Sequence, residues 1–111
     1  NNANYQHYFE VVRHEFLEKA GLNFHELHLQ GVDAVVASVQ IRYKIPLLGM
    51  DKFKCTISKI EKVSVKYVFH QEIIRIEDNA LCAKAKIEVV NLVNGKLSEP
   101  VIFNEAFADY I

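Results

Sequence analysis

Residues 4–20 read NYQHYFEVVRHEFLEKA, and the apolar side chains of this stretch recur every three or four positions. This spacing is typical of a helix with one apolar face. Gly21 follows directly, and glycine commonly ends a helix because it tolerates a left-handed backbone. The stretch therefore predicts an amphipathic helix with an apolar stripe of Tyr5, Phe9, Val12, Phe16 and Ala20, and with Tyr8 beside it.

Beyond a polar connector, the apolar positions alternate with a period of two, which indicates strands with one buried face. The expected strands lie at 34–43, 53–57, 63–76 and 81–89, and the pair Asn94-Gly95 predicts a tight turn. Consecutive strands with short connections pair antiparallel. The last stretch, 101–111, follows Pro100 and fits either a short helix or an edge strand.

The helix and the sheet each offer an apolar face that the other can cover. We therefore expect an α+β fold in which a curved antiparallel β-sheet is wrapped around one long central α-helix. The pattern alone also permits other α+β packings.

Composition limits the function. The chain has 111 residues, a net charge of −1 and 24% charged residues without a basic block, so we expect no nucleic-acid partner. No apolar run is long enough to span a membrane. Cys55 and Cys82 fit neither a metal site nor a dense disulfide framework, which favours reduced thiols in the cytoplasm. Cys55 is expected in the core, and Cys82 falls on the more polar side of its strand, where it can be exposed.

Five lysines lie within a short stretch, at Lys52, Lys54, Lys59, Lys62 and Lys66. A solvated strand face explains them most simply. The alternative is a cationic rim that attracts the phosphates of CoA or of a phosphopantetheine carrier.

The histidines do not indicate a metal site. His25 and His28 are three positions apart, but no further ligands cluster near them, so we expect surface histidines, no metal and no cofactor. His70 is expected to be half-buried in its strand. The chain has no Gly-x-Ser-x-Gly motif, which excludes an α/β-hydrolase mechanism.

Three segments of the helix carry a resemblance to a known family: NNANY at 1–5, YFE at 8–10 and RHEFL at 13–17. They resemble the start of the central helix in hotdog-fold acyl thioesterases of the 4-hydroxybenzoyl-CoA thioesterase-like family. RHEFLEK at 13–19 is also similar to plant plastid acyl-lipid thioesterases. Downstream, YKIPLL at 43–48 followed by Asp51 resembles the family's strand–Pro–turn–Asp junction, although here Met50 separates the glycine from the aspartate.

The resemblance implies hydrolysis of an acyl-CoA or acyl-carrier-protein thioester by a single hotdog thioesterase domain at 1–111. The family's catalytic carboxylate, usually an aspartate, lies in the loop before the helix. We therefore expect this residue, its loop and an N-terminal strand to precede Asn1, where the sequence begins without methionine.

The resemblance also implies roles for residues of the helix. The backbone amide at Asn2 is expected to stabilise the oxyanion that forms from the thioester carbonyl. Some hotdog thioesterases place the carboxylate on the helix itself, which makes Glu10 a catalytic candidate and Glu15 a weaker one.

Asn1, Tyr5 and Phe9 are candidates for substrate binding. Each also has a purely structural interpretation, because an asparagine can cap the helix and aromatic side chains fill a core. An acyl chain and a core have the same chemistry, so the pattern leaves both open.

The family also implies a homodimer or a dimer of dimers, whose sheets join edge to edge and whose active sites use both subunits. Pairing would remove exposed strand edges. Two alternatives remain for the function: another hotdog activity, such as a hydroxyacyl dehydratase or hydratase, and a non-catalytic acyl-binding module.

Overall fold

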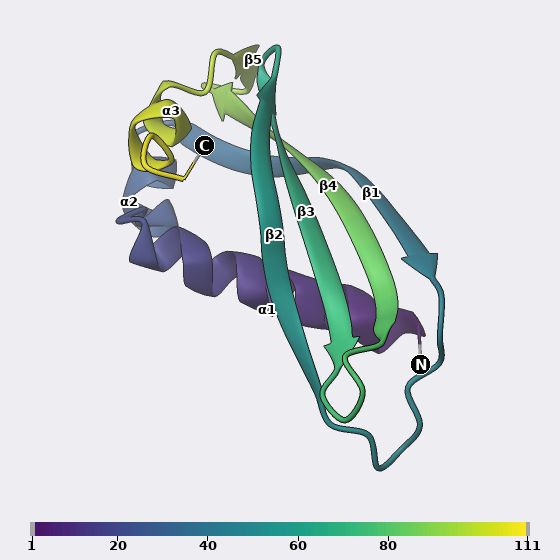
Figure 1. Ribbon diagram of the computed structural model, residues 1–111. Helices are drawn as coiled ribbons and strands as arrows, with labels where there is room; N and C mark the ends of the chain where they lie inside the picture. The colour runs from purple at the N-terminus through teal and green to yellow at the C-terminus, as the bar shows by residue number, and fades with distance from the viewer. Residues whose placement is uncertain (1, 111) are drawn as a thin grey trace.

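A computed structural model describes residues 2–110 of the chain, with the side chains of residues 4–110 (Figure 1). Its elements follow in the order α1 (Asn2–Lys19), α2 (Phe24–Leu29), β1 (Val32–Tyr43), β2 (Phe53–Val63), β3 (Lys66–Arg75), β4 (Leu81–Val93), β5 (Lys96–Ser98) and α3 (Val101–Ala106).

The strands form one sheet in the order β1-β4-β3-β2, with β5 paired to β4. Every pair of neighbours is antiparallel, as predicted for the consecutive pairs β2–β3 and β3–β4. The expected pairing of the consecutive strands β1 and β2 is wrong, because β1 pairs with β4 instead. β1 and β2 are the two edges of this order. The turn at Asn94-Gly95 is confirmed, with φ angles of 51° and 79°. It is tied to the start of β1, because Asn94 N–H donates to the Gly31 carbonyl at 2.7 Å.

Several elements differ from the prediction: the strand expected at 53–57 extends to Val63, and the short strand β5 was not expected. The strand expected at 63–76 begins at Lys66, because the chain turns at Ser64 with a φ of 57°. The expected polar connector contains α2, which Asn23 caps by accepting a hydrogen bond from Glu26 N–H at 3.1 Å. The ambiguous C-terminal stretch contains a helix, α3.

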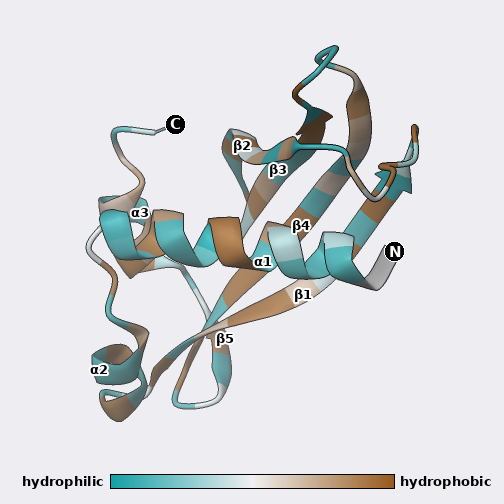
Figure 2. Ribbon diagram, turned by 90° about the horizontal axis from the view of Figure 1, so that it is seen from below, coloured by the Kyte–Doolittle hydropathy of each residue, from teal (hydrophilic) through white to brown (hydrophobic). Residues whose placement is uncertain are grey.

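α1 is an 18-residue helix that lies against one face of the sheet (Figures 1 and 2). Tyr5, Phe9 and Leu17 are buried in the shared core. The opposite side of α1 is exposed. The α+β class with an antiparallel sheet is therefore confirmed. A sheet wrapped around a central helix stays a prediction, because within one chain α1 covers the sheet from one side only.

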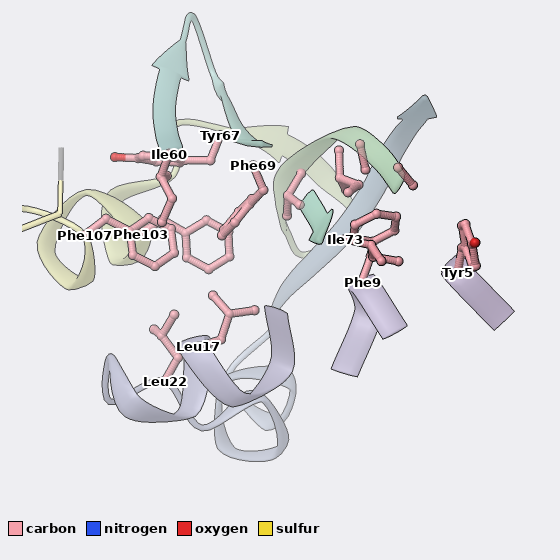
Figure 3. Packing of buried hydrophobic residues seen from close by; sticks show 14 of the residues in the cluster. Tyr5, Phe9, Leu17, Leu22, Ile60, Tyr67, Phe69, Ile73, Phe103 and Phe107 are labelled. Carbon is pink, nitrogen blue, oxygen red and sulfur yellow. The ribbon is translucent and has the colours of Figure 1, made fainter. Parts of the chain in front are cut away.

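A cluster of aromatic rings closes one end of the core. The Phe107 ring centroid lies 5.0 Å from those of Tyr67 and Phe103 and 5.8 Å from that of Phe69. Figure 3 shows Phe69, Phe103 and Phe107 gathered at this end, while Phe9 lies beside Ile73. α3 and the residue that follows it thus supply two of the rings that anchor the sheet, Phe103 and Phe107.

Both cysteines are free. Cys55 is half-buried in the core, as predicted. The expectation that Cys82 can be exposed is wrong, because it has no exposed surface. The pairing of β3 with β4 shifts register between Ile73 and Ile74, and this irregularity at the start of β4 accompanies the burial of Cys82.

The lysine group at 52–66 is not a free cationic rim. Lys59 lies 3.5 Å from Glu61, Lys66 lies 3.3 Å from Glu88, and Lys62 pairs with Glu99. Three of the five lysines are therefore partly neutralised on a solvated surface, which is the simpler of the two interpretations. Among residues 2–110, no helix has the length and apolar character needed to cross a membrane.

Candidate active site

α1 begins at Asn2, and its first turn contains no acidic side chain. The first backbone N–H groups of a helix have no partner within the helix and carry a partial positive charge. A cavity of about 380 Å³ lies beside this end of α1. Its lining comes from the first two turns of α1, the β1–β2 loop and the first residue of β2: Asn4, Tyr5, Tyr8, Leu47, Leu48, Gly49, Asp51 and Phe53. We call this space the tip cavity.

Tyr5 fastens the β1–β2 loop to α1. Its hydroxyl accepts a hydrogen bond from Leu47 N–H at 3.1 Å, and its ring centroid lies 5.5 Å from that of Tyr43. One turn later, the Tyr8 ring lies 4.8 Å from Phe53. The aromatic residues of the predicted stripe therefore do two things here: they bury apolar surface and they fix the wall of the tip cavity.

Asp51 is the carboxylate in the described lining of the tip cavity. It accepts a hydrogen bond from Leu48 N–H at 2.8 Å and lies 3.7 Å from Arg75 Nη1. Arg75 also binds Asp78 at 2.7 Å, and this hydrogen-bonded guanidinium lowers the pKa of Asp78 to about 2. Asp51 thus helps to close the β1–β2 loop. The sequence analysis identified this residue only as part of a turn and did not place it at a cavity.

A groove runs between α1 and the edge strand β1. It contains two cavities of about 240 Å³ each, and both are lined by Arg13, His14 and Val36. The cavity nearer the start of α1 adds Gln6, Phe9, Glu10, Val39, Ile41 and Ile87. The other is more apolar and adds Leu17, Phe24, Val32, Asp33, Ala34 and Val89.

Arg13 joins α1 to the middle of the sheet. Its Nη1 donates to Gln71 Oε1 at 3.1 Å, and the fully buried Gln71 donates from Nε2 to the Phe9 carbonyl at 3.0 Å. Burial lowers the pKa of Arg13, and the nearby Glu10 opposes this shift. Sequence reasoning missed this link, because Arg13 and Gln71 are 58 positions apart and only the fold brings them together.

The structure does not bring the two catalytic candidates together. Glu10 lies on the exposed side of α1, lines the groove, and approaches His14 Nε2 at 3.9 Å. A helix rises about 1.5 Å per residue, so Glu10 lies roughly 12 Å along α1 from Asn2. Asn1 and the side chain of Asn2 lie outside the described residues.

The predicted substrate-binding aromatics fall in two different places. Tyr5 lines the tip cavity, whereas Phe9 is 1% exposed and lines the groove. Neither position decides between an acyl-binding role and a core role, so their role in binding stays a prediction.

The remaining chemical candidates have structural explanations. His28 Nδ1 lies 2.6 Å from Asp33 Oδ1, and His25 is exposed. Within residues 2–110, no group of three or more potential metal ligands is assembled. Burial raises the pKa of Cys55 to about 11, so its thiol is protonated at neutral pH and is a poor nucleophile.

Comparison with known proteins defines the class. Residues 1–110 match the family model of the Thioesterase-like superfamily, and the chain belongs to this family. Solved structures with the same fold include thioesterases of the hotdog type. The protein is therefore a thioester hydrolase by class.

Particular relatives include a provisionally named esterase from Aquifex aeolicus, which is 29% identical over 97 residues, covering 87% of this chain and 74% of the relative. The chain is also similar to the chloroplastic acyl-acyl carrier protein thioesterase ATL3 of Arabidopsis thaliana, at 38% identity over 53 residues. That match covers 48% of this chain and 28% of the plant protein.

Among solved structures, a 1,4-dihydroxy-2-naphthoyl-CoA thioesterase from Synechocystis matches with a TM-score of 0.85 at 16% identity, covering 96% of this chain and 81% of that one. A Staphylococcus aureus protein solved in complex with CoA also gives a TM-score of 0.85, at 20% identity, covering 99% of this chain and 71% of that one. At these identities, the likeness shows the fold.

Proposed function

We propose that this protein hydrolyses the thioester of an acyl-CoA or an acyl carrier protein to a free acid and a thiol, in a cleft shared by two copies of the chain. The observation that carries this proposal is that α1 begins beside the tip cavity, whose wall is held in place by Tyr5. CoA is bound in the Staphylococcus aureus neighbour, which supports an acyl-CoA substrate. The similarity to a plant acyl-carrier-protein thioesterase supports the second carrier.

In this proposal, water attacks the carbonyl carbon of the thioester and the carbonyl oxygen becomes an oxyanion. The free N–H groups at the start of α1 stabilise that charge, an effect worth roughly 2.7–4 kcal/mol for one donor in comparable sites. A carboxylate accepts the proton of the attacking water. The C–S bond then breaks, and the thiolate takes up a proton as it leaves.

The carboxylate is the residue that the resemblance expects before Asn1, in the loop of a single hotdog domain. Glu10 is the second candidate. It faces the groove and lies far along α1 from the tip, which makes direct action at an oxyanion held by Asn2 N–H geometrically unfavourable. Asp51 is occupied by Leu48 N–H and lies near Arg75.

We further propose that two copies join through β1. This edge strand leaves three valines partly exposed, with Val35 at 40%, Val36 at 45% and Val39 at 39%. Exposed apolar side chains on an unpaired edge favour association, and pairing would satisfy the free backbone groups. A second copy would cover the groove between α1 and β1, so that the helices become central and each site uses both chains. A dimer of dimers is compatible with this edge.

We place the protein in the cytoplasm, where the free thiols of Cys55 and Cys82 would stay reduced.

Thiol release tests the proposed activity. The full-length protein is incubated with aliphatic acyl-CoAs of increasing length, an aromatic acyl-CoA and an acyl carrier protein, and the free thiol is measured with a disulfide reagent. We expect release above the spontaneous rate for at least one thioester, and Glu10→Gln should retain most of it. Release from none of these thioesters would overturn the proposal, and loss of water from a β-hydroxyacyl-CoA instead would assign a dehydratase. Loss of activity in Glu10→Gln with an intact fold would move the catalytic role to Glu10.

A further inference from the structure

Four exposed basic side chains lie on the face of the sheet that points away from α1: Arg42 on β1, Lys54 on β2, and Lys84 and Lys86 on β4. The residues next to Lys84 and Lys86 along β4 point the other way, because Ala83, Ala85 and Ile87 are in the core. We call these four residues the cationic patch.

The register brings like charges together in the patch. Arg42 pairs directly with Lys84, and Lys86 lies two residues further along β4 on the same face. Like charges at directly opposed positions destabilise a sheet. Among the β1 and β3 residues that pair with Lys84 and Lys86, the acidic one is Glu72, opposite Lys84. Within the described chain, none of the four basic residues of the patch has a carboxylate within ion-pair distance.

Apart from Glu72, two acidic residues that flank the patch are paired with other side chains. On the same face, Glu61 lies 2.7 Å from His70 and Glu88 lies 3.3 Å from Lys66. The whole chain has a net charge of −1, so the patch is a local excess of positive charge on a nearly neutral protein. A sheet that retains unpaired like charges at a cost in stability indicates a use for them.

The patch lies at the end of the sheet that carries the proposed site. Arg42 is followed by Tyr43, whose ring packs on Tyr5 in the first turns of α1. Arg42 and Tyr43 are consecutive strand residues, so their side chains point to opposite faces. A partner bound to the patch could therefore send a flexible arm around this end of the sheet toward the tip cavity.

The width of the patch argues for a protein partner. Arg42 and Lys54 lie on the two edge strands, three inter-strand steps apart. At about 4.8 Å per step, the charges extend over roughly 14 Å, which is much wider than one phosphate group. We propose that the cationic patch docks an acidic acyl carrier protein, which presents its thioester to the tip cavity. This inference rests on the proposed function and names the carrier that delivers the substrate.

Binding tests the patch without requiring turnover. The full-length protein is titrated with a phosphopantetheinylated, unacylated acyl carrier protein at two salt concentrations. Wild type should bind, and more weakly at high salt. Lys84→Glu/Lys86→Glu should weaken binding at least tenfold, because charges at the rim of an interface control encounter. The matched control, Lys19→Glu/Lys96→Glu, makes the same change in net charge at exposed lysines outside the patch and should weaken binding less than twofold. Thermal unfolding checks the fold of both variants.

Hydrolysis rates distinguish docking of a carrier protein from binding of other anions. The loss of kcat/KM in Lys84→Glu/Lys86→Glu should be at least tenfold greater for an acyl carrier protein than for the same acyl group on CoA or on uncharged N-acetylcysteamine. An equal loss on acyl-CoA would overturn the proposal in favour of a phosphate site.

Three further results would also overturn it: no carrier binding by wild type, equal weakening in both double variants, or patch-dependent binding only to vesicles of phosphatidylcholine and phosphatidylglycerol. The proposed function fails separately, when wild type releases no thiol from any thioester.

Discussion

Single residues on the inner face of the sheet show how burial changes their chemistry. Gln71 is fully buried and keeps both ends of its amide satisfied, by Arg13 and by the Phe9 carbonyl. Cys55 lies nearby on β2, where desolvation raises its pKa to about 11 against a weaker opposing effect of Arg13. This thiol therefore contributes to stability through its protonated form and does not act as a nucleophile.

A pH dependence of stability follows from Cys55. An unfolded cysteine has a pKa of about 8.5, so the unfolded chain loses this proton before the folded chain does. The contribution is fully present below about pH 8.5 and is lost as the pH rises toward about 11. We expect the denaturant midpoint of wild type to fall more steeply above pH 8.5 than that of Cys55→Ala. Parallel curves for the two proteins from pH 7 to 10.5 would contradict this assignment.

At the scale of elements, periodicity predicts most of the fold. The stripe in α1 and the alternation in β1, β2 and β4 repeat over enough residues to identify each element. Gly21 follows α1 and Asn94-Gly95 follows β4, and their left-handed backbone ends these two elements. The turn at Ser64 was missed because no glycine, proline or asparagine marks it. Cys82 was placed wrongly because local alternation does not show that Cys82 is the residue skipped in the pairing of β4 with β3.

The candidate site was less predictable than the fold, for the same reason. The helix tip was expected from the resemblance, but the wall of the tip cavity depends on contacts between Tyr5 and Leu47, which are 42 positions apart. The place of Asp51 in that wall and the link from Arg13 to Gln71 also depend on pairing across the fold. A single sequence contains the residues that make these contacts but does not show which residues pair with each other.

The edge strand β1 carries the prediction for assembly. We expect wild type to sediment as a dimer or a dimer of dimers and Val39→Lys to raise the dissociation constant at least tenfold, because a buried unpaired charge opposes association. Val101→Lys is the matched control, since Val101 is 56% exposed on α3, away from β1. A monomeric wild type, or a Val39→Lys protein that associates as tightly as the control, would contradict pairing through β1.

The two ends of the molecule have different roles. α3 and the aromatic cluster around Phe107 anchor the sheet at one end. The start of α1, the tip cavity and the loop held by Tyr5 lie at the other. The proposed chemistry needs only the second end, where backbone N–H groups are already oriented before a substrate arrives. The central claim is that one of these groups, the N–H of Asn2, stabilises the oxyanion.

Replacing Asn2 by proline tests this claim most directly. Proline is tolerated at the first position of a helix but has no N–H, whereas Asn2→Ala keeps the N–H and removes only the side chain. On the best thioester from the panel, kcat of the full-length Asn2→Pro protein should fall by roughly 10²–10³ relative to Asn2→Ala, the loss expected for one oxyanion donor. Equal kcat values for the two variants, with both proteins folded, would show that the start of α1 does not stabilise the oxyanion.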